Sequence, residues 1–211
     1  MQQKIDTIVF DMGQVLIHWQ PLALIAHMNL TEKQQELLLT ELFQSVEWVQ
    51  SDHGTIALEQ IVTQVCRRLP EDLHPAVEEL VLGWWRRPLV PMEGMAELIR
   101  ELKEKGYKIY LLSNANVDLR KYFHRIPGSE CFDGLMVSAE EHLLKPQHEI
   151  YHTLYSRFRL DPSRCLFIDD SPANIEGALC TGMDGIIFRG DAARLRRELG
   201  QKGVDVALAT E

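Results

Sequence analysis

The sequence lacks any long hydrophobic run, although 45% of its 211 residues are hydrophobic. No apolar stretch is long enough to span a bilayer, and the first residues, Met1–Asp6, do not resemble a secretory signal. Extended basic runs are also absent: the formal net charge is −9 and no run exceeds three basic residues. Such an acidic chain repels a phosphate backbone, so we expect neither a membrane nor a nucleic acid among its partners.

Cysteine is scarce as well. The four cysteines (Cys66, Cys131, Cys165 and Cys180) lie far apart and form no CxxC pair. This pattern is typical of buried free thiols in a reducing compartment, which predicts a cytoplasmic protein. Repeats and low-complexity tracts are missing, and the charged fraction of 25% is usual for a folded chain.

Short apolar runs rich in β-branched residues recur along the chain. They are Thr7–Phe10, Ile109–Ser113, Gly134–Ser138, Cys165–Asp169 and Gly185–Phe188. Near-continuous apolarity over such short runs indicates strands that are covered on both faces. Helical periodicity occurs between them, for example in residues 95–102, 150–158 and 175–179. This alternation predicts an α/β fold with a mostly parallel, doubly wound sheet.

Residues 18–90 interrupt the alternation. They contain helical candidates at roughly 31–43, 56–69 and 74–85 and no good strand. The triplet Asp52-His53-Gly54 predicts a turn between two of these helices. We therefore predict a helical cap domain at residues 18–90, inserted into a core domain made of residues 1–17 and 91–211.

Polar residues stand where three of the predicted strands end. The first strand runs into Asp11, the second into Ser113-Asn114 and the fourth into Asp169-Asp170. The carboxyl ends of parallel strands meet at one edge of a sheet, so these residues should converge on a ligand site. Adjacent carboxylates at a buried strand end repel each other, which favours a bound cation over the alternative, a solvated acidic turn ahead of Pro172.

Four short segments occur in a fixed order: Asp11-Met12-Gly13-Gln14-Val15-Leu16, Leu112-Ser113-Asn114, Lys145-Pro146 and Phe167-Ile168-Asp169-Asp170-Ser171. Over essentially the whole chain they resemble the ordered motifs of the haloacid dehalogenase-like (HAD) hydrolase superfamily. The resemblance extends to its bacterial phosphatases with an Asp-x-Gly-Asn first motif, a group that includes a glucose 1-phosphate phosphatase. It implies a HAD-like Rossmannoid sheet with an inserted cap, acting on small phosphorylated metabolites as a monomer or homodimer.

The resemblance also implies roles for single residues. Asp11 would be the nucleophile that forms an aspartyl-phosphate. Ser113 and Asn114 would donate hydrogen bonds to the phosphoryl oxygens, and Lys145 would offset the negative charge. From the residues alone, Asp11 also fits a capping role, Ser113-Asn114 a turn and Lys145-Pro146 a helix start.

The implied metal is Mg²⁺. Its ligands would be Asp11, the backbone carbonyl of Gly13 and Asp170, with Asp169 either a further ligand or an acceptor outside the first sphere. Asn174, near the fourth motif, fits a polar site residue as well as an ordinary first-turn helix residue.

One position departs from the usual pattern of this superfamily. Gly13 stands where its phosphatases carry a second Asp that acts as general acid and base, an assistance worth about 10²–10⁴-fold in rate. One interpretation is a phosphatase in which Gln14, His18 or a water takes that part. A sugar 1-phosphate would need less acid help because its hemiacetal oxygen leaves more readily.

Other interpretations stay open. A metal-independent 2-haloacid dehalogenase also lacks the second Asp, but its pattern has no Asp169-Asp170 pair. A phosphonatase-type hydrolase would need a cap lysine, and residues 18–90 offer Lys33 alone. A binding protein with little turnover is the third class. Candidate cap residues facing the cleft are His53, Arg67, Arg68, Arg86 and Arg87, and Trp84-Trp85-Arg86-Arg87 fits helix-end packing better than a phosphate clamp.

Overall fold

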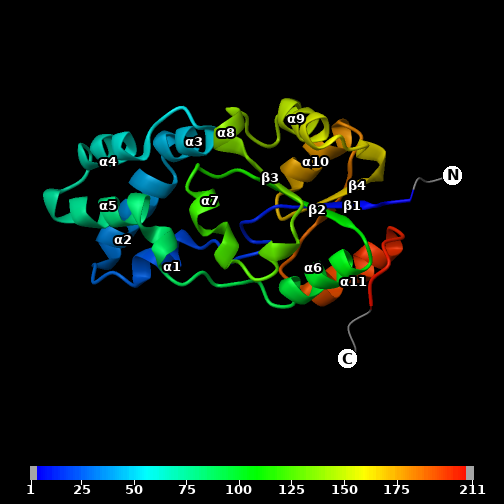
Figure 1. The fold of residues 1–211 in the computed structure, drawn as a ribbon. Coiled ribbons are helices and arrows are strands. Elements are labelled where there is room, and N and C mark those ends of the chain that lie inside the picture. Colours follow the sequence, from blue (N-terminus) through cyan, green and yellow to red (C-terminus); the bar gives the residue numbers. More distant parts are fainter. Residues whose placement is uncertain (1–3, 208–211) are drawn as a thin grey trace.

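A five-stranded parallel sheet forms the centre of the computed structural model, which describes residues 4–207 (Figure 1). The strands are β1 (Thr7–Phe10), β2 (Lys108–Ser113), β3 (Gly134–Val137), β4 (Cys165–Asp169) and β5 (Asp184–Ile187), in the order β3-β2-β1-β4-β5. The central strand β1 pairs Phe10 with Leu111 on one side and with Ile168 on the other. The predicted α/β fold is confirmed, and each strand end lies within one residue of its predicted position.

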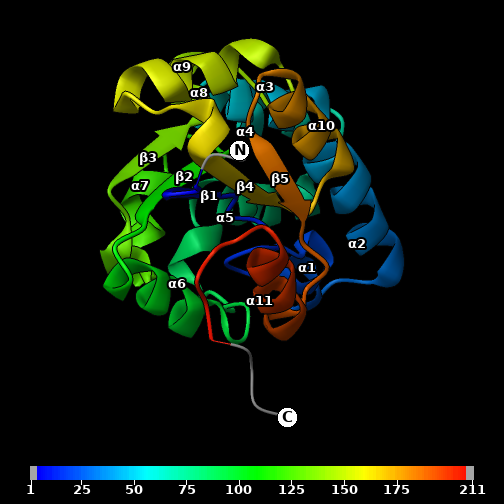
Figure 2. The same cartoon turned by 90° about the vertical axis from the view of Figure 1, so that its right-hand side faces the viewer.

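Helices cover both faces of this sheet (Figures 1 and 2). Helices α9 (His148–Phe158) and α10 (Pro172–Cys180) lie on one face, and α6 (Met95–Glu104) and α11 (Ala192–Gln201) lie on the other. Side chains of β1 alternate between the faces: Ile8 and Phe10 join the core under α6 and α11, whereas Val9 joins the core under α9 and α10. Both faces of each central strand are therefore buried, which explains the continuous apolar runs.

The remaining helices of the core are short. They are α7 (Leu119–Tyr122) and α8 (Ser138–Glu141), with 3₁₀ turns at Phe123–Arg125, Ser129–Cys131 and Pro162–Arg164. Both α7 and α8 follow the carboxyl ends of strands β2 and β3, on the side of the sheet where the polar strand ends gather.

Residues 18–90 form a helical cluster beyond the carboxyl ends of the strands (Figure 1). The helices are α1 (Pro21–Ala26), α2 (Glu32–Leu38), α3 (Val46–His53), α4 (Leu58–Cys66) and α5 (His74–Leu82). A π-helical turn at Leu39–Phe43 and 3₁₀ turns at Glu71–Leu73 and Trp84–Arg86 complete the cluster. The cluster has a buried apolar core of its own, which includes Ile25, Leu42, Ile61 and Leu80.

The predicted turn at Asp52-His53-Gly54 is wrong for two of its three residues. Asp52 and His53 belong to the last turn of α3, a helix that begins after the N-cap Ser45, whose side chain accepts from the backbone N–H of Trp48 at 3.2 Å. Gly54 then ends the helix in the left-handed conformation with φ 76°. Val46 and Val49 of α3 are exposed, so the hydrophobic periodicity of this segment is weak. For this reason the sequence did not predict a helix here.

The chain enters and leaves the helical cluster side by side. Ile17 bridges Pro91, the His18 N–H donates to the Val90 carbonyl at 2.9 Å, and the Met92 N–H donates to the Leu16 carbonyl at 2.9 Å. These paired segments coincide with the boundaries predicted for the cap, at residues 17/18 and 90/91. The division into two domains stays a prediction.

The four cysteines are free thiols, as predicted. Cys131 and Cys165 are buried, whereas Cys66 is half-buried and Cys180 is exposed, so the expectation of burial is wrong for Cys180. Cys180 is the last residue of α10 and is exposed to solvent there. None of the helices within residues 4–207 has the length and apolarity that crossing a bilayer requires.

Candidate active site

Residues from the ends of three strands line one cavity at the carboxyl edge of the sheet. Asp11 follows β1, Ser113 ends β2, and Asp169 ends β4 beside Asp170. The cavity has a volume of about 190 Å³, and the helical cluster covers it. Its lining comprises Asp11, Met12, Gly13, Gln14, Trp19, Trp48, Asp52, Trp84, Ser113, Asn114, Ala115, Asn116, Tyr122, Lys145, Asp170 and Asn174.

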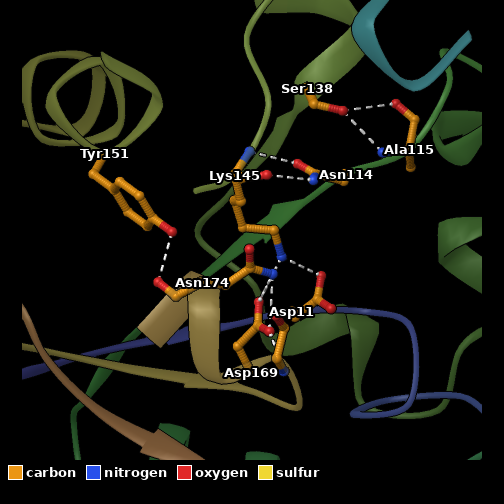
Figure 3. Close-up of polar contacts among 9 residues, drawn as sticks. Asp11, Asn114, Ala115, Ser138, Lys145, Tyr151, Asp169 and Asn174 are labelled. Carbon is orange, nitrogen blue, oxygen red and sulfur yellow. Dashed lines mark hydrogen bonds and ion pairs between the residues drawn. The ribbon is translucent and has the colours of Figure 1, made fainter. Parts of the chain in front are cut away.

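Lys145 lies between two carboxylates at the base of this cavity (Figure 3). Its Nζ is 2.7 Å from Asp11 Oδ1 and 2.7 Å from Asp169 Oδ2. The side chains of Lys145 and Asp169 are only 1% and 0% exposed. Burial alone would lower the pKa of the Lys145 ammonium, but the two carboxylates raise it above its usual value. Lys145 therefore carries a positive charge where water cannot screen it.

Asp11 is held in an unusual electrostatic state. Burial, opposed by the charge of Lys145 and reinforced by that of Asp169, raises the pKa of Asp11 to about 6. At neutral pH the carboxylate is ionised, and at 8% exposure it is poorly hydrated. A poorly hydrated carboxylate next to a cavity is a better nucleophile than one in bulk water, since fewer solvent hydrogen bonds must be broken.

Asp169 is saturated with hydrogen bonds. Its Oδ1 accepts from the Ser171 N–H at 2.8 Å and from Asn174 Nδ2 at 3.0 Å. Its Oδ2 accepts from Lys145 Nζ at 2.7 Å and from the same Nδ2 at 3.1 Å. The carbonyl of Asn174 accepts from the Tyr151 hydroxyl at 2.7 Å, which fixes this residue on α10 (Figure 3). These hydrogen bonds hold Asp169 in place and position Lys145 and Asn174 beside it.

Asp170 completes an acidic cluster. The residue is exposed overall, but its carboxyl group is partly shielded from water. This partial burial, followed by the charge of Asp169, raises the pKa of the Asp170 carboxyl group. Asp11, Asp169 and Asp170 each present a carboxylate oxygen, and these oxygens lie within 4.8 Å of one another. Three anions with one lysine between them leave excess negative charge, and hard carboxylate oxygens at this spacing fit a divalent cation such as Mg²⁺.

Ser113 and Asn114 both reach the cavity but differ in their contacts. Ser113 is 1% exposed and lines the cavity. Both polar side-chain atoms of Asn114 form hydrogen bonds with the main chain of Lys145. Asn114 Oδ1 accepts from the Lys145 N–H at 2.8 Å, and Asn114 Nδ2 donates to the Lys145 carbonyl at 3.0 Å (Figure 3). The side chain of Asn114 therefore positions Lys145, and a hydrogen bond from Asn114 to a phosphoryl group stays a prediction.

Gly13 lies in the cavity wall with room beside it. A Cβ at this position would meet the Cβ of Trp19 at 3.5 Å, an ordinary van der Waals distance. Glycine is therefore not required here by close packing. Of the two side chains predicted to replace an acid at this position, Gln14 lines the cavity, whereas His18 is exposed and lines a neighbouring groove.

Aromatic rings form another part of the cavity wall. The Trp19 ring lies 4.6 Å from that of Trp84 and 5.9 Å from that of Trp48, and the Trp84 ring lies 5.1 Å from that of Tyr122. Of these residues, only Trp84 belongs to a segment considered from the sequence; Trp19, Trp48 and Tyr122 were missed. The available signal was that all four tryptophans of the chain lie in residues 18–90.

The predicted cap cations lie elsewhere. None of His53, Arg67, Arg68, Arg86 and Arg87 is among the residues that line this cavity. Arg68 pairs with Glu41 and Glu47, and Arg87 pairs with Glu79. Arg86 stacks 5.4 Å from the centre of the Trp85 ring, which confirms helix-end packing for this segment. Within the described residues that line the cavity, Lys145 is the sole cation.

This fold and this acidic strand-end site place the chain among the Rossmann-like α/β enzymes. The model of the haloacid dehalogenase-like hydrolase family matches residues 5–182, and the chain belongs to this family. It is thus a HAD hydrolase, as its motifs predicted.

Similar proteins include two named phosphatases. The sesquiterpene phosphatase astK of Aspergillus oryzae is 28% identical over 84% of this chain and 87% of that protein. The phosphorylated carbohydrates phosphatase of Thermotoga maritima is 21% identical over 86% of this chain and 83% of that protein. In fold, the chain is similar to HAD family enzyme bt-2542 of Bacteroides thetaiotaomicron, solved with magnesium and inorganic phosphate. The TM-score is 0.67 at 20% identity, over 90% of this chain and 98% of that one.

Proposed function

We propose that this protein is a Mg²⁺-dependent phosphomonoester hydrolase that works through a covalent phosphate on Asp11. The observation that carries the proposal is the buried contact of Lys145 with Asp11 and Asp169 at 2.7 Å each, at the base of a cavity lined by Asp170. The phosphatases among its relatives support the same class of reaction.

In this proposal Asp11 attacks the phosphorus atom of the bound ester. Lys145 holds the attacking carboxylate in place and offsets part of the negative charge that gathers around the phosphoryl group. Ser113, buried against the same cavity, donates a hydrogen bond to a phosphoryl oxygen. Splitting hydrolysis into phosphoryl transfer to Asp11 and later attack by water replaces one difficult step by two easier ones.

Asp11, Asp170 and the backbone carbonyl of Gly13 are the proposed metal ligands. Asp169 is the outer acceptor, because Lys145, Asn174 and the Ser171 N–H already occupy both of its oxygens. When bound, Mg²⁺ would supply positive charge to the phosphate and to the carboxylates around it.

The leaving group of the substrate would lie against Trp19, Trp48, Trp84 and Tyr122. This wall favours an alcohol with an apolar face, such as an aryl, isoprenyl or sugar alcohol, over one that carries a second phosphate. With Lys145 as the sole cation among the described lining residues, a second phosphate would find no further charged partner. Sugar phosphates such as glucose 1-phosphate stay candidates.

The alternative hydrolases fit less well. A phosphonatase-type reaction needs a lysine from the cap, and Lys33 is exposed in the first turn of α2 and does not line the cavity. A metal-independent dehalogenase does not account for three carboxylates gathered within 4.8 Å.

The test is phosphate release from a panel of aryl, isoprenyl and glycosyl phosphates with Mg²⁺, with EDTA, and with the Asp11→Asn variant. Release that requires Mg²⁺ and disappears in Asp11→Asn supports the proposal, and the Glu59→Gln variant, on the exposed side of α4, serves as a matched control. Metal-independent halide release from a 2-haloacid would identify a dehalogenase instead. Binding of Mg²⁺ and phosphate without any turnover would identify a binding protein.

A further inference from the structure

The cavity contains a carboxyl group that the motifs of the sequence do not predict. Asp52, next to the last residue of α3, lines the same cavity as Asp11, Gly13 and Lys145. It comes from the helical cluster, whereas the other carboxyl groups of the cavity come from the strand ends. Its carboxyl group makes no hydrogen bond or ion pair with any residue between positions 4 and 207.

Asp52 is half-buried in the cavity wall, and its carboxyl group has no partner there among the described residues. A carboxyl group without a protein partner is free to exchange a proton with a molecule bound in the cavity. Burial, followed by the charge of Asp11, raises the pKa of Asp52 to about 7. Asp52 therefore keeps a proton near neutral pH more readily than an ordinary aspartic acid, and it can also release that proton.

The backbone around Asp52 is fixed to the core. The Ser138 hydroxyl on α8 donates to the Asp52 carbonyl, and the carbonyl of His53 lies 3.2 Å from Nδ1 of His142. Gly54 lies so close to α8 that a Cβ there would be 2.0 Å from the Ala139 carbonyl oxygen. Three consecutive residues of the helical cluster thus dock on one short helix of the core, which sets the position of the Asp52 side chain over the strand ends.

We propose that Asp52 is the general acid and base of the reaction, in the part that an aspartate at position 13 would otherwise play. The inference rests on the proposed function. It follows from three structural observations: the missing side chain at Gly13, the unpartnered carboxyl group of Asp52 in the same cavity, and the docking of residues 52–54 on α8.

The proton balance of the two steps is complete. As an oxygen of Asp11 bonds to phosphorus, the bond from phosphorus to the alcohol oxygen breaks, and that oxygen takes its electron pair and the proton of Asp52. In the second step the Asp52 carboxylate takes a proton from water while the water oxygen attacks phosphorus. The bond between phosphorus and Asp11 then breaks, which releases phosphate and restores the Asp11 carboxylate and the protonated Asp52.

Other charged groups around Asp52 bear on its titration. Asp11 and Asp170 at the strand ends, Lys145 in the loop after α8, and Tyr122 on α7 line the same cavity as Asp52. His53 and His142 meet beside it, with ring centroids 6.3 Å apart. Burial raises the pKa of Tyr122, so this hydroxyl stays neutral and contributes no charge in the neutral range.

The test compares wild type, Asp52→Asn and Asp52→Glu on two substrates, with Glu59→Gln as a control. An alkyl phosphate has a poor leaving group and needs the acid, whereas 4-nitrophenyl phosphate leaves without a proton. We expect Asp52→Asn to slow phosphorylation of Asp11 by the alkyl ester about 10²–10⁴-fold. With the nitrophenyl ester the variant should release a rapid burst of one nitrophenolate per enzyme and then accumulate phosphorylated protein, visible as added mass. Asp52→Glu should restore part of the turnover.

Two results would overturn the inference. Turnover of both esters by Asp52→Asn within about threefold of wild type would mean that no proton passes through Asp52. An equal loss of phosphorylation with both esters would mean that Asp52 has a structural part only. If wild type itself hydrolyses no phosphomonoester and acquires no phosphate on Asp11, then the proposed function fails, and the assignment of Asp52 with it.

Discussion

Gly54 approaches Ala139 so closely that a Cβ on the glycine would lie 2.0 Å from the alanine carbonyl oxygen. This contact joins the end of α3 to α8, and it is possible because Gly54 also has φ 76°, where residues with a Cβ are strained. The same contact brings Asp52 over the strand ends.

We predict that Gly54→Ala destabilises the protein by more than the about 1–3 kcal/mol expected for left-handed strain, and that it lowers the phosphate release rate. Gly106→Ala is the matched control, because Gly106 has φ 85° and a Cβ there would meet nothing within 4 Å. Urea denaturation of both variants measures the difference in unfolding free energy. Equal losses in the two variants would mean that the contact with Ala139 contributes nothing.

A second prediction concerns Lys145. Replacing Lys145 by Met leaves Asp11 and Asp169 facing each other without their cation in a buried site. Removing one member of a buried ion pair costs about 3–5 kcal/mol, so Lys145→Met should lower the unfolding free energy by this order at pH 7 and abolish turnover. Part of the stability should return at pH 5, where the carboxyl groups take up protons. Unchanged stability at pH 7 would contradict the charge arrangement described for this site.

The third prediction follows from the pKa of Asp11, which rises from 3.8 to about 6 on folding. A carboxyl group with a raised folded-state pKa favours the folded protein when protonated. Its contribution is present below pH 3.8 and is lost as the pH rises through 6. The loss amounts to about 3 kcal/mol. In EDTA, Asp11→Asn should therefore gain stability relative to wild type between pH 4 and pH 6, measured by urea denaturation at each pH.

Glu101 should behave in the opposite way. Burial would raise its pKa, but hydrogen bonds from Arg196, the Ala207 N–H and Lys105 lower the pKa to about 2. The stability it contributes is present above pH 4.5 and is lost as the pH falls through 2. Glu101→Gln should cost about 2 kcal/mol at pH 7 and much less at pH 2, allowing for its partial exposure to solvent. A constant difference over this range would count against the linkage.

The fifth prediction uses the room beside Gly13, where a Cβ would meet the Trp19 Cβ at 3.5 Å. We expect Gly13→Asp to be tolerated and to restore turnover of alkyl phosphates to the Asp52→Asn variant, because it places an acid in the same cavity. The second variant, Gly13→Asn, has the same shape and no proton to give. Rescue by both variants, or by neither, would contradict the proposal that an aspartate at position 13 and Asp52 can fill the same acid-base role.

The sequence alone predicted the sheet and its polar edge. Strand runs such as Cys165–Asp169 are apolar because both faces of the sheet are covered, and this pattern is local in the chain. Parallel pairing then brings the ends of β1, β2 and β4 to one edge, so Asp11, Ser113 and Asp170 could be expected together. The family motifs predicted Lys145 as well.

Other features depended on contacts between distant segments. Asn114 binds the main chain of Lys145 with both side-chain groups, and Arg68 pairs with Glu41 and Glu47 on neighbouring turns. Neither pairing has a local sequence signal, because the partners are far apart in the chain. The same is true of the tryptophans that line the cavity.

Asp52 shows the difference between what local sequence predicts and what tertiary contacts decide. In the sequence it stands before His53-Gly54 and predicts a turn, since local propensity favours that conformation. In the tertiary structure it lies in the last turn of a helix, and the docking of Gly54 on α8 brings it to the cavity that Asp11 lines. Sequence periodicity determined the sheet and the chemistry of its edge. Only the packing of the helical cluster on the core decided which further side chain completes the cavity, because that packing joins residues with no local relation.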